Sequence, residues 1–272
     1  MSELLPAVME ERRASTLPGV LALSRTVILD DGMEVPLHIA RYDRESFRPR
    51  LVKFDEPTPI VPWARQHGIS EATNAGYNTL GGAKPLGDIW IGGQPLPHEP
   101  WAGKHGPGRG AIQIDPDGAI RIDTRSRLSR RPPGDLLQTG PQLLRHGEIP
   151  FGPDDDPEGI SAAWHNPETR QLDDDWVRVL PRAPRSAIGL SDKHIWSAVC
   201  DGDTRRNRGL SLFELAAQMQ DIGIQDALNL DGGGSASQYS NNELRNMPFG
   251  YEMYHPLGRP IWSAFVYEQI KL

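Results

Sequence analysis

Hydrophobic and polar residues alternate over long stretches of this chain, and this alternation predicts β-strands. Residues 20–29 and 34–43 flank a short turn at residues 30–32, which contains two aspartates and a glycine. The pattern recurs in residues 110–123, where isoleucines alternate with polar residues on both sides of the sequence DPDG. Acidic residues followed by glycine are typical of tight turns, so each of these regions predicts a β-hairpin.

The second half of the chain predicts further strands and one helix. Residues 184–202 read as two strands joined near Asp192 and Lys193, and residues 226–230 and 261–272 read as single strands. Between them, Ser211 and Glu214 have the spacing of a capping box. The hydrophobic residues that follow at helical spacing are Leu212, Leu215, Ala216, Met219 and Ile222, and Gly223 marks the end of the helix.

Together these elements predict an α+β fold, a largely antiparallel or mixed β-sheet with helices packed on it. We expect a single compact domain over residues 17–272, preceded by a flexible N-terminal extension of residues 1–16. The chain has 272 residues, of which 38% are hydrophobic and 24% charged, and this length is ample for one large core.

Charge and composition reduce the number of possible functions. The formal net charge of −7 disfavours a nucleic-acid-binding or nucleotide-binding role. A single cysteine, Cys200, lies in an apolar run, which predicts a buried small side chain and excludes an internal disulfide framework. The first thirty residues show no signal-peptide pattern and no stretch is long enough to span a membrane, so the expected location is cytoplasmic. The oligomeric state stays open.

Residues 227–242, ALNLDGGGSASQYSNN, carry the most unusual local pattern. In a strand, Asn229 and Asp231 share one face while Leu228 and Leu230 share the other. The next residues are Gly232, Gly233, Gly234 and Ser235, which allow backbone N–H groups to line a concavity that a ligand can approach closely. An acid beside such backbone donors suits a sugar or a sugar phosphate. A tight turn in which Asp231 caps its own amides is the structural alternative.

Three other segments stand out. Asn74 is followed by small residues, Tyr77 and a glycine-rich loop; Gly140 and a proline interrupt an apolar segment; and Arg185 opens a strand. Each has an ordinary structural explanation when it is taken alone.

In combination, these segments resemble the phosphodiester glycosidase family. The resemblance rests on five blocks in family order, which span residues 74–238: NAGY from Asn74, TGPQLLRHGEI containing Gly140, RSAIG from Arg185, the helix with its following strand, and NLDGGGSAS from Asn229. Family members have a motif similar to NGGFF or NAGFF at the position of Asn74. This chain instead has Tyr77 and an asparagine after the glycine.

The resemblance implies an enzyme that cleaves the glycosidic bond of a sugar-1-phosphodiester and releases the sugar and a phosphomonoester. The expected substrate is a small molecule or a glycan with such a linkage. A non-catalytic module that binds phosphosugars or glycans is the alternative.

The candidate catalytic residues are Asp231, as nucleophile or base, Arg185, as partner of the phosphate, and Asn74. The candidate substrate-binding residues are Asn229, Gly232, Gly233, Gly234, Ser235, Gly140 and Tyr77.

Weaker signals remain. Trp101 and Trp164, in loops rich in glycine and proline, are candidate platforms for a sugar ring. Five arginines lie within eleven residues and either attract an anionic substrate or form a solvated hairpin edge; they are Arg121, Arg125, Arg127, Arg130 and Arg131. Acidic runs at residues 154–156 and 173–175 lack the EF-hand pattern, so a divalent cation such as calcium is possible but not supported, and we expect no cofactor.

Overall fold

The first of three sheets forms the centre of the protein. The computed structural model describes residues 17–79, 84–101, 106–164, 182–203, 209–250 and 253–270. The first sheet has six strands, all paired antiparallel. In spatial order they are β1 (Val20–Ile28), β2 (Glu34–Asp43), β12 (His194–Cys200), β11 (Arg185–Leu190), β13 (Asp226–Asn229) and β10 (Gln142–Leu144). The two hairpins predicted around residues 30–32 and around Asp192 are confirmed as β1–β2 and β11–β12.

Two further sheets of five strands each pack beside the first. The second consists, in order, of β15 (Glu243–Leu244), β14 (Gln238–Ser240), β4 (Glu71–Asn74), β18 (Ile261–Gln269) and β3 (Phe47–Thr58). The third consists of β6 (Gln94–Pro95), β5 (Ile89–Ile91), β9 (Asp135–Gln138), β7 (Gly110–Ile114) and β8 (Ile120–Thr124). A small pair, β16 (Phe249–Gly250) with β17 (Met253–Tyr254), is separate. The hairpin predicted in residues 110–123 is confirmed as β7–β8.

The structure has two α-helices and several short 3-10 segments among the described residues. They are α1 (Ile60–Gln66), α2 (Leu212–Asp221) and the short 3-10 segments η2 (Arg125–Arg127), η3 (Pro157–Trp164) and η4 (Gly233–Ser235). The capping box predicted for α2 is present: Glu214 N–H donates to the Ser211 hydroxyl and Ser211 N–H donates to the Glu214 carboxylate. The helix packs on β10, β11 and β13 of the first sheet.

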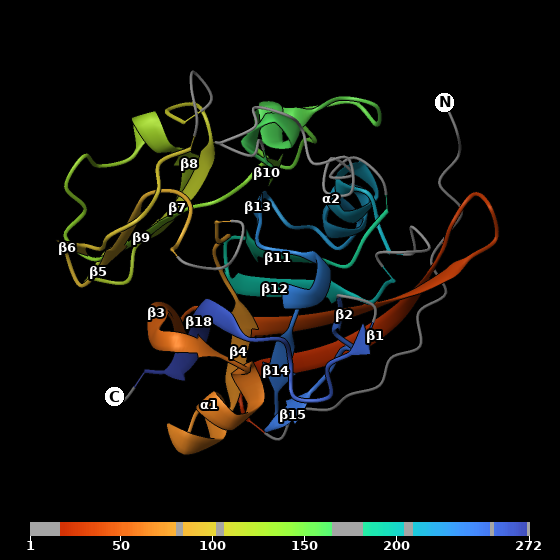
Figure 1. Ribbon diagram of the computed structural model, residues 1–272, viewed down its shortest axis with the longest axis horizontal. Coiled ribbons are helices and arrows are strands. Elements are labelled where there is room, and N and C mark those ends of the chain that lie inside the picture. Colours follow the sequence, from red (N-terminus) through yellow and green to blue (C-terminus); the bar gives the residue numbers. More distant parts are fainter. Residues whose placement is uncertain are drawn as a thin grey trace.

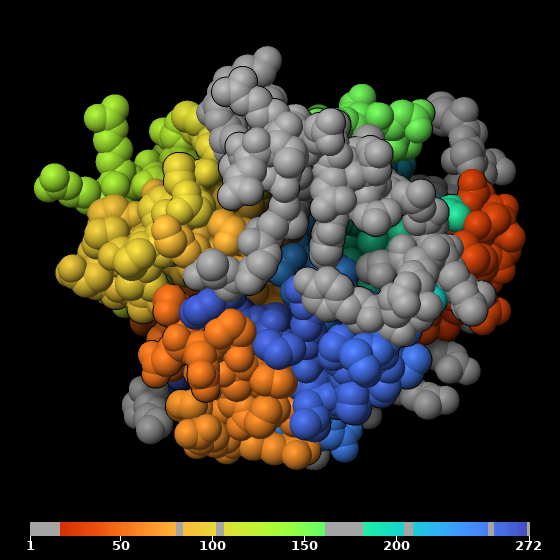
Figure 2. All heavy atoms as spheres, viewed as in Figure 1, coloured from red at the N-terminus to blue at the C-terminus, as the bar shows by residue number. Residues whose placement is uncertain are grey.

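Three apolar clusters connect these layers into one domain. One lies between α2 and the first sheet, a second fills the space between the first sheet and the other two, and a third lies between the second sheet and α1. Figure 1 shows this order, with α2 above the first sheet, the second sheet below it and α1 at the bottom. In Figure 2 the yellow and green atoms of the third sheet form a lobe at the upper left, above the orange atoms of α1 and β3.

The protein is richer in β-structure than the expected α+β arrangement. Within the described residues there are two α-helices against three antiparallel sheets, so the expectation of helices as a major layer is corrected. The predictions for residues 1–16, residues 173–175 and the side chain of Trp164 lie outside what the structure describes. No described helix has the length and apolar character of a transmembrane span.

Candidate active site

The antiparallel register of β11 and β13 brings Arg185 and Asp231 to the same edge of the first sheet. Ala187 pairs with Asn229, so two residues further along each strand Arg185 lies opposite Asp231. Backbone bonds continue this pairing beyond β13, because Leu230 N–H donates to Ser186 O at 2.8 Å. Directly opposed residues of an antiparallel pair have side chains on the same face. The main chains of Arg185 and Asp231, 46 residues apart in sequence, are therefore neighbours at this edge, and the charges of both side chains affect the pKa of Tyr77.

The glycines after Asp231 form the short segment η4, and their main role is to permit close backbone approach. Gly232 N–H donates to the Asp231 carboxylate at 2.9 Å, and Gly233 N–H donates to Pro184 O at 2.8 Å. A Cβ atom at Gly232 would lie 2.7 Å from Pro184 O, closer than such contacts allow. The sequence predicts that these N–H groups face a ligand; the structure instead engages those of Gly232 and Gly233 within the protein.

The Asp231 carboxylate is partly buried and has a perturbed pKa. Burial raises its pKa from 3.8 to about 6. Hydrogen bonds from the Ser235 side chain and from Gly232 N–H, together with the positive charge of Arg259, oppose this rise. A carboxyl group with a pKa near 6 is mostly ionised at neutral pH yet remains a competent proton acceptor, which suits a general base or nucleophile.

Asn74 joins the second sheet to the first from a fully enclosed position. Its side-chain carbonyl accepts from the Ser186 hydroxyl at 2.8 Å and from Ser237 N–H at 2.9 Å, and its amide donates to Asp231 O at 2.6 Å. Only 1% of Asn74 is exposed. These hydrogen bonds are all made within the protein, so Asn74 positions the main chain at Asp231, and its direct role in catalysis stays a prediction.

Asn229, Tyr77 and Gly140 form a second buried network beside Asp231. The Asn229 amide donates to the Tyr77 hydroxyl, to Leu230 O at 2.9 Å and to Gly140 O at 3.3 Å, and Tyr77 itself donates to Gly140 O at 3.1 Å. These carbonyl partners fix the orientation of the amide. Its oxygen, Oδ1, is buried and has no hydrogen-bond partner among the residues that the structure describes. A buried acceptor without a donor is costly, and a ligand hydroxyl would satisfy it.

Four charged side chains lie close enough to Tyr77 to affect its pKa. Burial raises the pKa of Tyr77 well above its usual value, and the negative charges of Asp231 and Glu158 raise it further. Arg185 and Arg109 act in the opposite direction. Two carboxylates and two guanidinium groups are thus close enough to one phenol to affect its titration, so they share one region of the protein.

Sequence reasoning missed Arg109 and Glu158. Arg109 is completely buried, and its guanidinium lies 3.8 Å from the centre of the Trp101 ring. Its Nε and one terminal nitrogen have no hydrogen-bond partner in the described ranges. Glu158 accepts from Gly110 N–H at 2.7 Å and from Gln142 N–H at 2.8 Å, and burial raises its pKa. A Cβ atom at Gly140, where φ is +90°, would lie 2.6 Å from Glu158 Oε2. Gly140 is therefore required by this contact and by its backbone conformation.

Arg185, Cys200 and Trp101 are all buried. Arg185 is 6% exposed, and its Nε donates to Leu210 O at 3.0 Å, which fixes the guanidinium. Burial lowers the pKa of Arg185 and raises that of the Cys200 thiol to about 12, so Cys200 is the inert buried residue that was predicted. Trp101 is 5% exposed, and its ring is packed edge-on against Tyr77, with 5.5 Å between ring centres. Within the described part of the chain, no cluster of three or more His, Cys, Asp or Glu side chains could hold a metal ion.

Solved structures of other proteins have the same fold as this chain. The catalytic domain of zebrafish N-acetylglucosamine-1-phosphodiester alpha-N-acetylglucosaminidase, auto-inhibited by its pro-peptide, has a TM-score of 0.67 at 20% identity over 96% of this chain and 87% of its own. A hypothetical protein from Synechocystis has a TM-score of 0.65 at 16% identity over 98% of this chain and 64% of its own. At these identities the similarity establishes the fold. A search of curated proteins finds no match.

The fold is thus one that a glycosidase catalytic domain uses. A family model described as phosphodiester glycosidase matches residues 67–267, which include every candidate site residue named above. The chain belongs to the phosphodiester glycosidase family.

Proposed function

We propose that this protein hydrolyses the glycosidic bond of a sugar-1-phosphodiester. The observation that carries the proposal is the cross-strand placement of Asp231 and Arg185 at one sheet edge, in a chain of the phosphodiester glycosidase family. In this reaction the bond between the anomeric carbon and the phosphate oxygen breaks, a water oxygen becomes bonded to the anomeric carbon, and the leaving group is a phosphomonoester.

Asp231 is the proposed nucleophile or base. With a pKa near 6, its carboxylate is ionised at neutral pH and can attack the anomeric carbon or accept a proton from the attacking water. Asn74 holds the main chain at Asp231 through its bond to the carbonyl oxygen, and Ser235 and Gly232 hold the carboxylate. These three contacts fix the position of the reacting group before substrate binds.

Arg185 is the proposed partner of the phosphate. A phosphomonoester is stable as an anion, so its departure needs little help from a general acid and more from a positive charge that stabilises it. A guanidinium matches phosphate oxygens with paired N–H donors, and it acts more strongly where water is excluded. The buried position of Arg185 opposite Asp231 supports this role.

Asn229 is the proposed ligand for a sugar hydroxyl. Asn229 lies two residues before Asp231, and its buried Oδ1 has no donor within the described part of the chain. A hydroxyl group of the bound sugar is a donor of suitable size, and a site that loses such a partner discriminates strongly against sugars that lack the hydroxyl.

The test is turnover of a panel of α-linked sugar-1-phosphodiesters, followed by release of free sugar and of phosphomonoester. The wild-type protein should cleave at least one compound, and Asp231→Asn should abolish this while the protein still folds. Asp226→Asn, at the other end of β13, is the matched control and should keep its activity, because the Asp226 carboxylate accepts from His146 N–H at 3.1 Å, at the strand end away from Asp231. If no compound is cleaved but several raise the melting temperature, the protein is a binding module and the proposal is wrong.

A further inference from the structure

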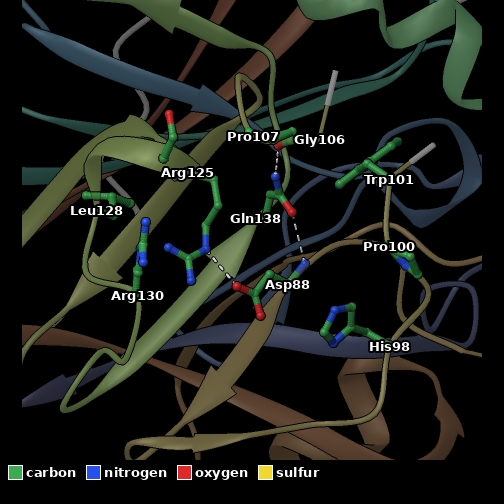
Figure 3. Close-up of a pocket in the computed structure, with 11 residues that line it drawn as sticks. Asp88, His98, Pro100, Trp101, Gly106, Pro107, Arg125, Leu128, Arg130 and Gln138 are labelled. Carbon is green, nitrogen blue, oxygen red and sulfur yellow. Dashed lines mark hydrogen bonds and ion pairs between the residues drawn. The ribbon is translucent and has the colours of Figure 1, made fainter. Parts of the chain in front are cut away.

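A pocket of about 520 Å³ opens in the third sheet, and the proposed chemistry does not use it. Its polar lining comes from segments that are distant in sequence: Asp88 before β5, His98 after β6, Arg125 at the start of η2, Arg130 beyond η2, and Gln138 at the end of β9 (Figure 3). Trp101 forms part of the wall. Two of the five clustered arginines of the sequence therefore line a pocket, while the others do not.

The described lining of this pocket carries more positive than negative charge. Arg125 is held in place, because its Nε donates to Asp88 at 2.6 Å and its NH1 donates to Ser129 O at 2.9 Å. Asp88 and Arg125 therefore offset one another. Arg130 is exposed and adds a second positive charge to a lining whose described residues contain a single carboxylate. In a chain with a net charge of −7, this local excess of positive charge favours an anionic ligand.

His98 supplies a hydrogen-bond acceptor to the same pocket. Its Nδ1 lies 2.9 Å from Leu96 O, and because a carbonyl only accepts, the proton of a neutral imidazole is on Nδ1. The other nitrogen, Nε2, is then an acceptor. An arginine donor and an imidazole acceptor, beside the ring of a tryptophan, suit a hydroxylated group that also bears an anion.

The pocket shares a wall with the candidate active site. Trp101 lines the pocket and packs edge-on against Tyr77, which is bonded to Asn229 and Gly140. Gln138, also in the lining, lies two residues before Gly140, and its side chain accepts from Asp88 N–H at 3.1 Å. Trp101 and Gln138 therefore place the pocket beside the buried network around Tyr77 and Asn229.

We propose that the pocket receives the group that the phosphodiester carries beyond its phosphate, and that this group is hydroxylated and bears a second anion, a carboxylate or a phosphate. The inference rests on the proposed function, because it identifies the pocket as the part of the same site that selects the leaving group. Arg130 is the residue that recognises the anion, and His98 accepts from a hydroxyl.

The experiment compares two diesters with the same sugar-1-phosphate, one carrying glucose and the other glucuronate beyond the phosphate. The wild-type protein should show a higher kcat/KM for the glucuronate diester at low salt, by about fivefold for one partly exposed charge contact. Arg130→Gln should remove this preference and leave the rate on the glucose diester unchanged. Arg131→Gln is the matched control, because it removes the same charge at the next residue, which is exposed and does not line the pocket.

Three results would overturn the inference and leave the proposed function intact. The wild type could cleave both diesters equally, the preference could survive in Arg130→Gln, or Arg131→Gln could lose it to the same extent. Both diesters carry a sugar that the panel shows to be released, so the proposed function fails only if the whole panel is left intact. In that case calorimetric binding of the same two compounds decides on the pocket alone. Tighter binding of the glucuronate compound that depends on Arg130 and not on Arg131 supports the inference; binding without that dependence contradicts it.

Discussion

Replacing Asp231 with asparagine should make the protein inactive and, at neutral pH, more stable. Burial raises the pKa of this carboxyl from 3.8 to about 6, so the folded state holds the ionised form at a cost. A shift of about two pKa units corresponds to about 3 kcal/mol of stability that the wild type lacks above pH 6 and regains as the pH falls toward 4. An asparagine side chain does not titrate and avoids this cost.

The direction of the pH dependence follows from the sign of the shift. Because the folded-state pKa lies above the unfolded one, the folded protein binds the proton more tightly, and acidification stabilises it through this group. The advantage of Asp231→Asn over the wild type should therefore grow by about 2 kcal/mol between about pH 4.5 and about pH 8. Any effect of the substitution that does not depend on pH cancels in this difference.

Urea unfolding of the wild type and of Asp231→Asn at the two pH values measures the difference in their unfolding free energies directly. Turnover of the best diester from the panel, measured on the same preparations, gives the activity. The reasoning is refuted if the difference in unfolding free energy between variant and wild type is the same at both pH values or becomes smaller as the pH rises. The pKa of Asp231 would then not be raised in the folded state. Retained turnover in the variant would remove Asp231 from the chemistry.

Three further predictions follow from the same geometry. The kcat/KM of the wild type should fall about tenfold per pH unit below about pH 6, because protonated Asp231 cannot act as base or nucleophile; a flat pH-rate profile down to about pH 4.5 would contradict this. Asn74→Ala should lower the free energy of unfolding by about 2–3 kcal/mol, since it leaves buried partners on both sheets unpaired, and denaturant curves that match the wild type would count against the bridge. Cys200 should resist thiol reagents in the folded protein and react only on unfolding, because burial raises its pKa to about 12; rapid native-state labelling would contradict its placement.

Local signals in the sequence predicted the elements that depend on local physics. The capping box of Ser211 and Glu214 and the hairpin turns specify their structures within a few residues, and α2, β1–β2, β7–β8 and β11–β12 formed as expected. Strand β4 gave no such signal. Its four residues, Glu71–Asn74, are all buried, so they show no alternation, and the side chains of Glu71 and Asn74 bind partners from distant segments.

The candidate site could be predicted in its positions but not in its contacts. The glycine block showed that the chain bends closely after Asp231, yet only the register of β11 and β13 places Arg185 opposite it. The amides of Asn74 and Asn229 have several possible uses in a sequence, and their partners come from other strands and loops. Arg109 and Glu158 were missed because neither belongs to a recognisable motif, and their proximity to Tyr77 depends on how the third sheet and η3 pack.

The central claim is that the bond between the sugar and the phosphate breaks on the sugar side. Hydrolysis of a cleaved diester in water enriched in ¹⁸O, followed by mass spectrometry of both products, tests it most directly. The account predicts that the label appears at the anomeric carbon of the released sugar and that the phosphomonoester carries none from the reaction. Label in the phosphomonoester would show cleavage at phosphorus, which contradicts a glycosidase mechanism at Asp231.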